Sequence, residues 1–186
     1  MSSQSNKGIV EIQSHFVEKI ADNMQSFGVS TTVGRVLGII YMQGKPMTLD
    51  ELSAETGMSK TRMSQVVREM IDLNIAERAF KKGVRKDLYQ VEQDYYQTFT
   101  SLFTSTWHNA INKHIHFEQK LKEKLHDLNH VEKLPDTNEQ LITEITIELK
   151  AWMDYYDWIK RLISFFESGE IFQHVPKKQA GGNKYE

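Results

Sequence analysis

The stretch "TGMSKTRMSQVVREM" at residues 56–70 decides the fold of this chain. After Gly57 no glycine or proline interrupts it, and Ser59 carries a side chain that suits a helix N-terminus. Apolar residues follow at helical spacing and predict the buried face of a helix. They are Met63, Val66, Val67, Met70 and Ile71. The opposite face carries hydroxyl, amide and guanidinium groups, where surface helices usually favour Glu and Lys.

A shorter helix is predicted immediately before this one. Thr48 and Glu51 have the spacing of a capping box, in which a hydroxyl and a carboxylate satisfy the first backbone amides of a helix. Leu49 and Leu52 give this helix an apolar side, and Gly57 ends it. Two helices joined by a short glycine-containing turn, the second with a polar outer face, predict a helix-turn-helix.

The next segment, "IAERAFKKGVRKDLYQV" at residues 75–91, predicts a β-hairpin. The residues suited to two strands are Ile75, Ala79 and Phe80 before the glycine and Leu88, Tyr89 and Val91 after it. The tip between them, residues 81–86, contains four Lys and Arg. A helix-turn-helix followed at once by a basic hairpin predicts a winged helix.

The predicted winged helix is basic, although the whole chain is not. Between Met58 and Gln90 there are eight Lys and Arg against four Asp and Glu, whereas the chain has a formal net charge of −2. A basic patch attracts a polyanion, and donor groups on an exposed helix face suit the major groove of DNA. We therefore predict that double-stranded DNA is contacted by Ser59, Lys60, Thr61, Arg62, Ser64, Gln65 and Arg68 of the helix and by Lys82, Arg85 and Lys86 of the wing. The alternatives are a polar face that only meets water and a winged helix that binds protein.

Helices are also predicted on both sides of the winged helix. Apolar residues at spacings of three and four over residues 9–27 predict a first helix. Gly34 and Gly38 predict close packing of the second helix, which starts near Ser30. Two long C-terminal helices follow, separated by "KLPDTNEQ" at residues 133–140. The last has two adjacent apolar stripes, so we expect it to be covered on two sides.

The predicted fold class is therefore mostly α with a small β wing: a winged helix-turn-helix with long N- and C-terminal dimerisation helices. The expected divisions are an N-terminal packing helix at 1–29, the DNA-binding domain at 30–92, a helical dimerisation and effector-binding region at 93–174, and a disordered tail at 175–186.

Several other classes of protein find little support. The sequence has no cysteine, no apolar signal core and no apolar run of the ~18 residues needed for a membrane span, so we expect a cytoplasmic protein without a membrane partner. No Gly-rich phosphate loop, Gly-x-Ser-x-Gly or His-Glu-x-x-His motif is present, so we expect neither catalysis nor a cofactor. His126 and His130 could share a helix face, but no third ligand has a telling spacing, and we predict no metal site.

The chain resembles the MarR-type regulators, and more closely the GbsR-type subgroup of choline-responsive repressors of glycine betaine synthesis. The resemblance is carried by "VGRVLGIIYMQGKPMTLDEL" (33–52), "GMSKTRMSQVVREM" (57–70), "KGVRKDLYQVEQDYYQ" (82–97) and "FFESGEIF" (165–172). It implies a homodimer that represses osmoprotectant genes at a pseudo-palindromic operator and responds to a small ligand. The Asp-x-Arg tip usual in MarR wings is not matched, because Gly83-Val84-Arg85-Lys86-Asp87 replaces it.

Aromatic residues gather outside the winged helix: 13 of the 19 lie between Tyr95 and Phe172. A quaternary ammonium ligand such as choline or glycine betaine is held by ring faces, because it has no donor for hydrogen bonds. The rings that we predict to form such a cage are Tyr41, Tyr95, Tyr96, Trp107, Trp152, Tyr155 and Tyr156. The alternatives are an aromatic core or dimer seam, and a cleft for phenolic or drug-like compounds.

Overall fold

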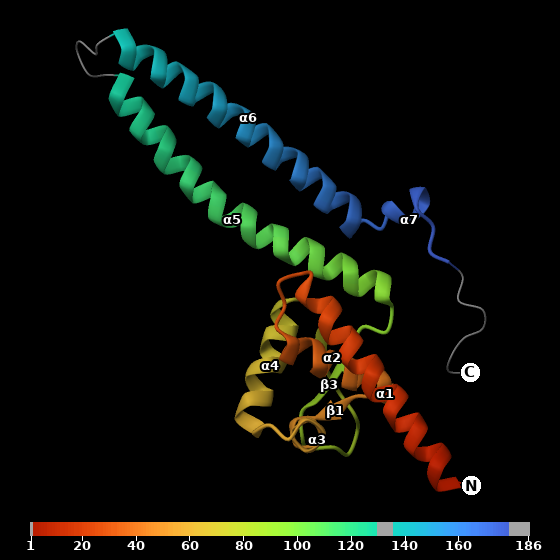
Figure 1. The fold of residues 1–186 in the computed structure, drawn as a ribbon. Coiled ribbons are helices and arrows are strands. Elements are labelled where there is room, and N and C mark those ends of the chain that lie inside the picture. Colours follow the sequence, from red (N-terminus) through yellow and green to blue (C-terminus); the bar gives the residue numbers. More distant parts are fainter. Residues whose placement is uncertain (1, 130–135, 179–186) are drawn as a thin grey trace. The chain divides into compact units, whose positions relative to one another are not determined.

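The computed structural model describes residues 2–129 and 136–178 and divides into two compact units. The N-terminal unit ends at Ser105, and the C-terminal unit begins at Thr106. The helices are α1 (Ser2–Gln25), α2 (Thr31–Gln43), α3 (Leu49–Thr56), α4 (Lys60–Asp72), α5 (Tyr95–Asn129), α6 (Asp136–Glu167) and α7 (Ile171–His174) (Figure 1). The strands are β1 (Met47–Thr48), β2 (Ala76–Ala79) and β3 (Leu88–Val91). The predicted fold class, mostly α with a small β wing, is confirmed.

Helices α1 and α2 pack closely because α2 presents glycines to α1. A Cβ added at Gly34 would lie 2.7 Å from the Ala21 Cα atom, and one added at Gly38 would lie 3.1 Å from the Val17 Cα atom. At the edge of the same contact, the Arg35 guanidinium donates to both Glu18 carboxylate oxygens, at 2.7 and 2.8 Å. The close packing predicted from the glycine spacing is therefore confirmed.

The helix-turn-helix is fixed by local capping. The Thr48 side chain accepts from the Glu51 backbone amide and the Glu51 carboxylate accepts from the Thr48 amide, which completes the predicted capping box of α3. Gly57 ends α3 with φ of +69°, a conformation that costs a residue with a side chain far more than glycine. The Ser59 side chain then accepts from the Arg62 amide at the start of α4.

The wing contains one strand that the sequence did not predict. The sheet is antiparallel in the order β1-β3-β2, with Met47 opposite Tyr89 and Ala76 opposite Val91. Strand β1 was missed because two residues are too short to show alternation. Ile75 and Phe80 lie outside β2, which corrects the predicted strand, and Phe80 is 92% exposed.

The N-terminal unit has a continuous apolar core. Side chains from α2, α3 and α4 are fully buried in it, and Leu102 of α5 joins them. Ser105 of α5 donates to the Leu73 carbonyl, and Asn74 donates to the Ser105 hydroxyl, both at 3.3 Å. The first turns of α5 thus pack with the winged helix, and the division between the units falls inside this helix.

In the C-terminal unit, α5 and α6 bury one apolar stripe each. The buried residues include Ile111 of α5 and Leu149, Ile159 and Ile163 of α6. The second stripe of α6 was expected to be covered, but Trp158 is 49% exposed in the single chain.

Two predicted boundaries of this region also change. The predicted break at 133–140 is partly wrong, because α6 begins at Asp136; residues 130–135 lie outside the description. The predicted tail is described only as far as residue 178. None of the helices in the described ranges is long and apolar enough to cross a membrane.

Candidate functional site

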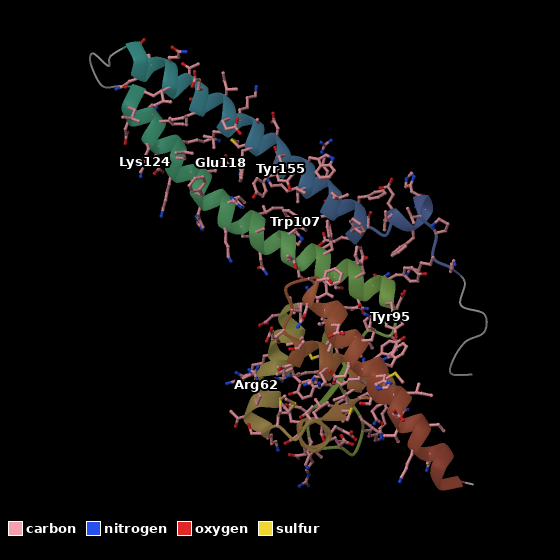
Figure 2. The ribbon with its side chains drawn as sticks, in the orientation of Figure 1. Arg62, Tyr95, Trp107, Glu118, Lys124 and Tyr155 are labelled. Atoms are coloured by element: carbon pink, nitrogen blue, oxygen red, sulfur yellow. The ribbon has the colours of Figure 1, made fainter. Side chains whose placement is uncertain are left out.

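Helix α4 presents the predicted polar face to solvent. The buried residues of α4 are Met63, Val66, Val67 and Met70. Their packing in the core fixes the rotation of the helix about its own axis. Thr61, Gln65 and Arg68 are exposed on the other side, and Ser64 is half-buried. Figure 2 shows Arg62 on the outside of α4, and its guanidinium donates to the Gln65 side-chain oxygen at 3.4 Å. These groups can donate to and accept from base edges.

The wing adds a second group of exposed cations. Lys82 and Arg85 are exposed in the turn between β2 and β3, where Gly83 has φ of +86°. Exposed cations on such a turn can bind phosphate oxygens, and phosphate contacts contribute affinity and orientation but little sequence preference. The structure thus exposes both Lys82 and Arg85, as a phosphate contact requires.

Lys60 and Lys86, in contrast, share a partner that was not predicted. The Lys60 Nζ atom lies 2.8 Å from Asp50 Oδ1, and the Lys86 Nζ atom lies 2.6 Å from Asp50 Oδ2. Hydrogen bonds from Lys60 and then Lys86 lower the pKa of the Asp50 carboxyl from its ordinary value to about 2. The same contact with Asp50 raises the pKa of Lys86. One carboxylate therefore links α3, the start of α4 and the wing.

The rings proposed for a cage occur in two groups, one in each unit. In the N-terminal unit, Tyr41 of α2 and Tyr95 of α5 form a tyrosine pair with ring centroids 4.5 Å apart. Tyr96 is exposed on the next position of α5. A cavity of about 60 Å³ adjoins the tyrosine pair and is also lined by Asn23, Glu92 and others. It combines aromatic faces with a carboxylate, which are the groups that attract an organic cation.

The second group, the hairpin rings, consists of His114, Trp152 and Tyr156. The His114 ring lies 4.3 Å from Tyr156 and 5.9 Å from Trp152, measured between centroids. These rings line a cavity of about 270 Å³ between α5 and α6. Burial raises the pKa of Tyr156.

Two further predicted cage residues lie in the same unit. The Tyr155 and Tyr156 rings of α6 have centroids 5.3 Å apart, and Tyr155 is exposed. Trp107 lies on α5 and is half-buried (Figure 2 labels both Tyr155 and Trp107). The seven predicted rings are thus divided between the two units, and their convergence into one cage stays a prediction. His114 was not predicted, because a histidine on a long helix gives no sign of a ring partner on another helix.

Comparison with known families accounts for both units. Residues 27–86 match the MarR family, and residues 95–173 match the C-terminal helical hairpin of GbsR family transcriptional regulators. The HTH-type transcriptional repressor OpcR of Bacillus subtilis (strain 168) is 59% identical over 169 residues, which cover 91% of each chain. The chain belongs to the GbsR family of MarR-type transcriptional regulators. It is therefore a DNA-binding regulator and not an enzyme.

One further relative supports the assignment of this GbsR-family chain, and one solved structure supports its fold. The HTH-type transcriptional repressor GbsR of the same organism is 33% identical over 163 residues, covering 86% of this chain and 88% of the relative. A crystal structure of a transcriptional regulator, 17% identical, aligns with a TM-score of 0.52 over 84% of this chain and 98% of the other. At that identity the second comparison supports the fold alone.

Metal binding finds no support among the side chains that the structure describes. No group of three or more His, Asp and Glu in that part of the chain is placed to hold an ion. His130, one of the two histidines considered from the sequence, lies outside the described residues.

Proposed function

We propose that this GbsR-family regulator is a homodimeric repressor that reads its operator with α4 and grips the phosphate backbone with the wing. The observation that carries the proposal is the exposed polar face of α4, whose rotation is set by a fully buried apolar face. Gln65 and Arg68 supply groups that discriminate between bases, and Lys82 and Arg85 supply charges that do not.

Contacts to bases and contacts to phosphates predict different effects of mutation. Gln65→Ala and Arg68→Ala should each cost about 1–3 kcal/mol on a duplex enriched by the wild-type protein from a random pool, and should relax the preference at single base pairs. Lys82→Ala should weaken binding to every duplex alike and reduce the slope of log K against log salt by about 1. Fluorescence anisotropy at several salt concentrations measures both. Unchanged affinity in the Gln65 and Arg68 variants would show that α4 does not enter the groove.

Dimerisation through the long helices is supported by apolar side chains that the single chain leaves in solvent. Ile147 and Trp158 of α6 are 64% and 49% exposed, and Ile12 of α1 is 68% exposed. Large exposed apolar patches usually mark protein interfaces. To occupy successive major grooves, the two α4 helices of such a dimer must lie about 34 Å apart.

The dimer is tested by the molar mass in solution. Light scattering after gel filtration should give twice the 21.7 kDa of one chain for the wild type and a lower value for Trp158→Glu. Thr146→Glu is the control, because it adds the same charge at an exposed polar position of α6. A monomeric wild type, or equal dissociation of both variants, would contradict the proposed interface.

The ligand that we propose is a quaternary ammonium compound, choline or glycine betaine, bound at the tyrosine pair. Tyr41, Tyr95 and Glu92 offer two ring faces and a carboxylate at one small cavity. The Glu92 carboxylate accepts from the backbone amide of Asp94 at 2.8 Å. In the hairpin cavity, by comparison, Glu118 and Asp157 are each paired with a lysine. Because the cavity at the tyrosine pair is small, an entering ammonium group must displace a ring, and this displacement would shift the regulator between states of different DNA affinity.

Calorimetric titration with choline, glycine betaine and salicylate tests the ligand and its place. Tyr41→Leu and Tyr95→Leu should each weaken choline binding roughly 30-fold, the equivalent of one cation–π contact of about 2 kcal/mol. Trp152→Leu should leave choline binding unchanged. The opposite pattern would move the site to the hairpin rings, and binding of salicylate alone would favour a sensor of phenolic compounds.

We further propose that the regulated genes serve osmoprotectant uptake or synthesis and that choline alters the DNA affinity of the regulator. The resemblance to choline-responsive repressors supports this assignment. Saturating choline should change the dissociation constant of the enriched duplex, and an unchanged constant would contradict regulation by this ligand.

A further inference from the structure

One exposed carboxylate connects the two parts of the winged helix that are expected to meet DNA. Asp50 lies in the first turn of α3 and bonds Lys60 of α4 through one oxygen and Lys86 of the wing through the other. The neighbouring Glu51 is held by the backbone amide and hydroxyl of Thr48. Asp50 is therefore the acid that bonds both lysines, whereas Glu51 acts on Lys86 only through its charge.

We propose that Asp50 is a positioning residue for DNA binding: it holds Lys60 and Lys86 side by side so that both bind one backbone phosphate. The inference rests on the proposed DNA-binding surface, because Lys60 and Lys86 belong to it. Asp50 itself does not touch DNA in this arrangement. It acts through the two ammonium groups, which come from elements far apart in the sequence.

The charges of the cluster suit this role. Two ammonium groups close together repel each other unless an anion lies between them. Each ammonium group has three N–H donors, so bonding Asp50 leaves two for a phosphate. The cluster of two lysines and one aspartate carries a net charge of +1 and still attracts an anion. Holding the wing lysine beside the lysine of α4 also reduces the side-chain freedom that DNA binding would otherwise remove.

Folding stability gives no comparable reason for the arrangement. All three side chains are well exposed, at 42% for Asp50, 59% for Lys60 and 65% for Lys86. Ion pairs at such exposure contribute little to stability, because water and salt screen them. The opposite functional role, in which Asp50 competes with phosphate for the lysines, predicts that removing the carboxylate tightens DNA binding.

The first test is therefore the sign of a single substitution. Asp50→Asn should weaken binding to the enriched duplex and to a random-sequence duplex by a similar factor, without changing the salt slope, because the number of cations is unchanged. Glu55→Gln is the matched control, since it removes the same charge from an exposed position of the same helix. It should leave affinity equal or slightly higher. Tighter binding by Asp50→Asn, or equal effects of both substitutions, would overturn the proposal.

The second test asks whether the lysines act as a unit. Lys60→Ala and Lys86→Ala should each weaken DNA binding. The fold-loss of affinity in the double variant should be smaller than the product of the two single fold-losses, by a factor of about 2 or more. In the Asp50→Asn background the two losses should multiply. Multiplicative losses of affinity in the wild-type background would refute shared positioning, but they would not contradict the proposed DNA-binding surface. If neither lysine substitution weakened binding, the proposed surface would itself be wrong at these residues.

Discussion

The two units differ in what their apolar residues contact. In the N-terminal unit, Leu52, Met63 and Met70 are completely buried within a single chain. In the C-terminal unit, Phe117 and Ile147 are 58% and 64% exposed, although the same unit buries Ile163 almost fully. The core of the winged helix is therefore closed within one chain, although Phe80 of the wing is 92% exposed. The hairpin of α5 and α6 buries apolar residues on one side and leaves others in solvent.

This difference separates two tasks within one regulator. The winged helix must hold α4 at a fixed rotation, because a rotated helix would present other side chains to the groove. The hairpin has an apolar face left over, which suits association with a second copy as proposed above. Four predictions break or sharpen the comparison.

The largest expected effect is loss of a core side chain. Leu52→Ala removes a fully buried side chain of α3 and should lower the free energy of unfolding by about 2–5 kcal/mol, measured by urea denaturation. Its effect should not depend on protein concentration. Ile147→Ala is the matched substitution in the hairpin, and its cost should rise with concentration if a second copy covers that side chain. A concentration-independent cost of similar size at Ile147 would remove the contrast between the units.

A smaller effect is expected where α1 and α2 touch. Gly34→Ala places a Cβ 2.7 Å from the Ala21 backbone, so the helices must separate, at a cost of about 1–3 kcal/mol. Gly8→Ala in α1 is the control, since a Cβ there meets nothing within 4 Å and should raise helix stability by up to ~1 kcal/mol. Thermal unfolding of both variants measures the difference. Equal melting temperatures would mean that the close approach is absent in solution.

Loss of the capping hydroxyl should lower the free energy of unfolding by less than the substitution at Gly34 does. Thr48→Ala removes the acceptor of the Glu51 amide and should lower the free energy of unfolding by about 1 kcal/mol. Because α3 supports the turn before α4, amide hydrogen exchange should accelerate at the start of α3 before it does in α5. Uniform acceleration across both units would contradict a local role for the cap.

The smallest effect concerns the protonation of Asp50. Hydrogen bonds from Lys60 and Lys86 lower the pKa of Asp50 to about 2, whereas the pKa of an unpaired aspartate is about 3.9. A lowered folded-state pKa means that the contribution of the pair is present above the unfolded value and is lost as the pH falls towards 2. NMR titration of the carboxyl carbon should show this midpoint. In Lys60→Ala the midpoint should rise, and an unchanged midpoint would mean that the contact is absent.

The sequence by itself determined the winged helix, because each of its signals is local. The capping residues Thr48 and Ser59 act on amides three positions away, and the buried face of α4 is visible in apolar spacing within one helix. Only the two-residue strand β1 and the exact ends of β2 were missed. Family resemblance added the regulator class, which the comparisons then established.

Tertiary structure alone decided which distant side chains meet. Lys86 and Asp50 are 36 positions apart, and no periodicity connects them. The same holds for Tyr41 with Tyr95 and for His114 with Tyr156, whose rings come from different helices. Spacing along one helix specifies which face a residue occupies, but contacts between elements depend on how whole faces pack. That is why the sequence predicted the faces and the structure assigned their partners.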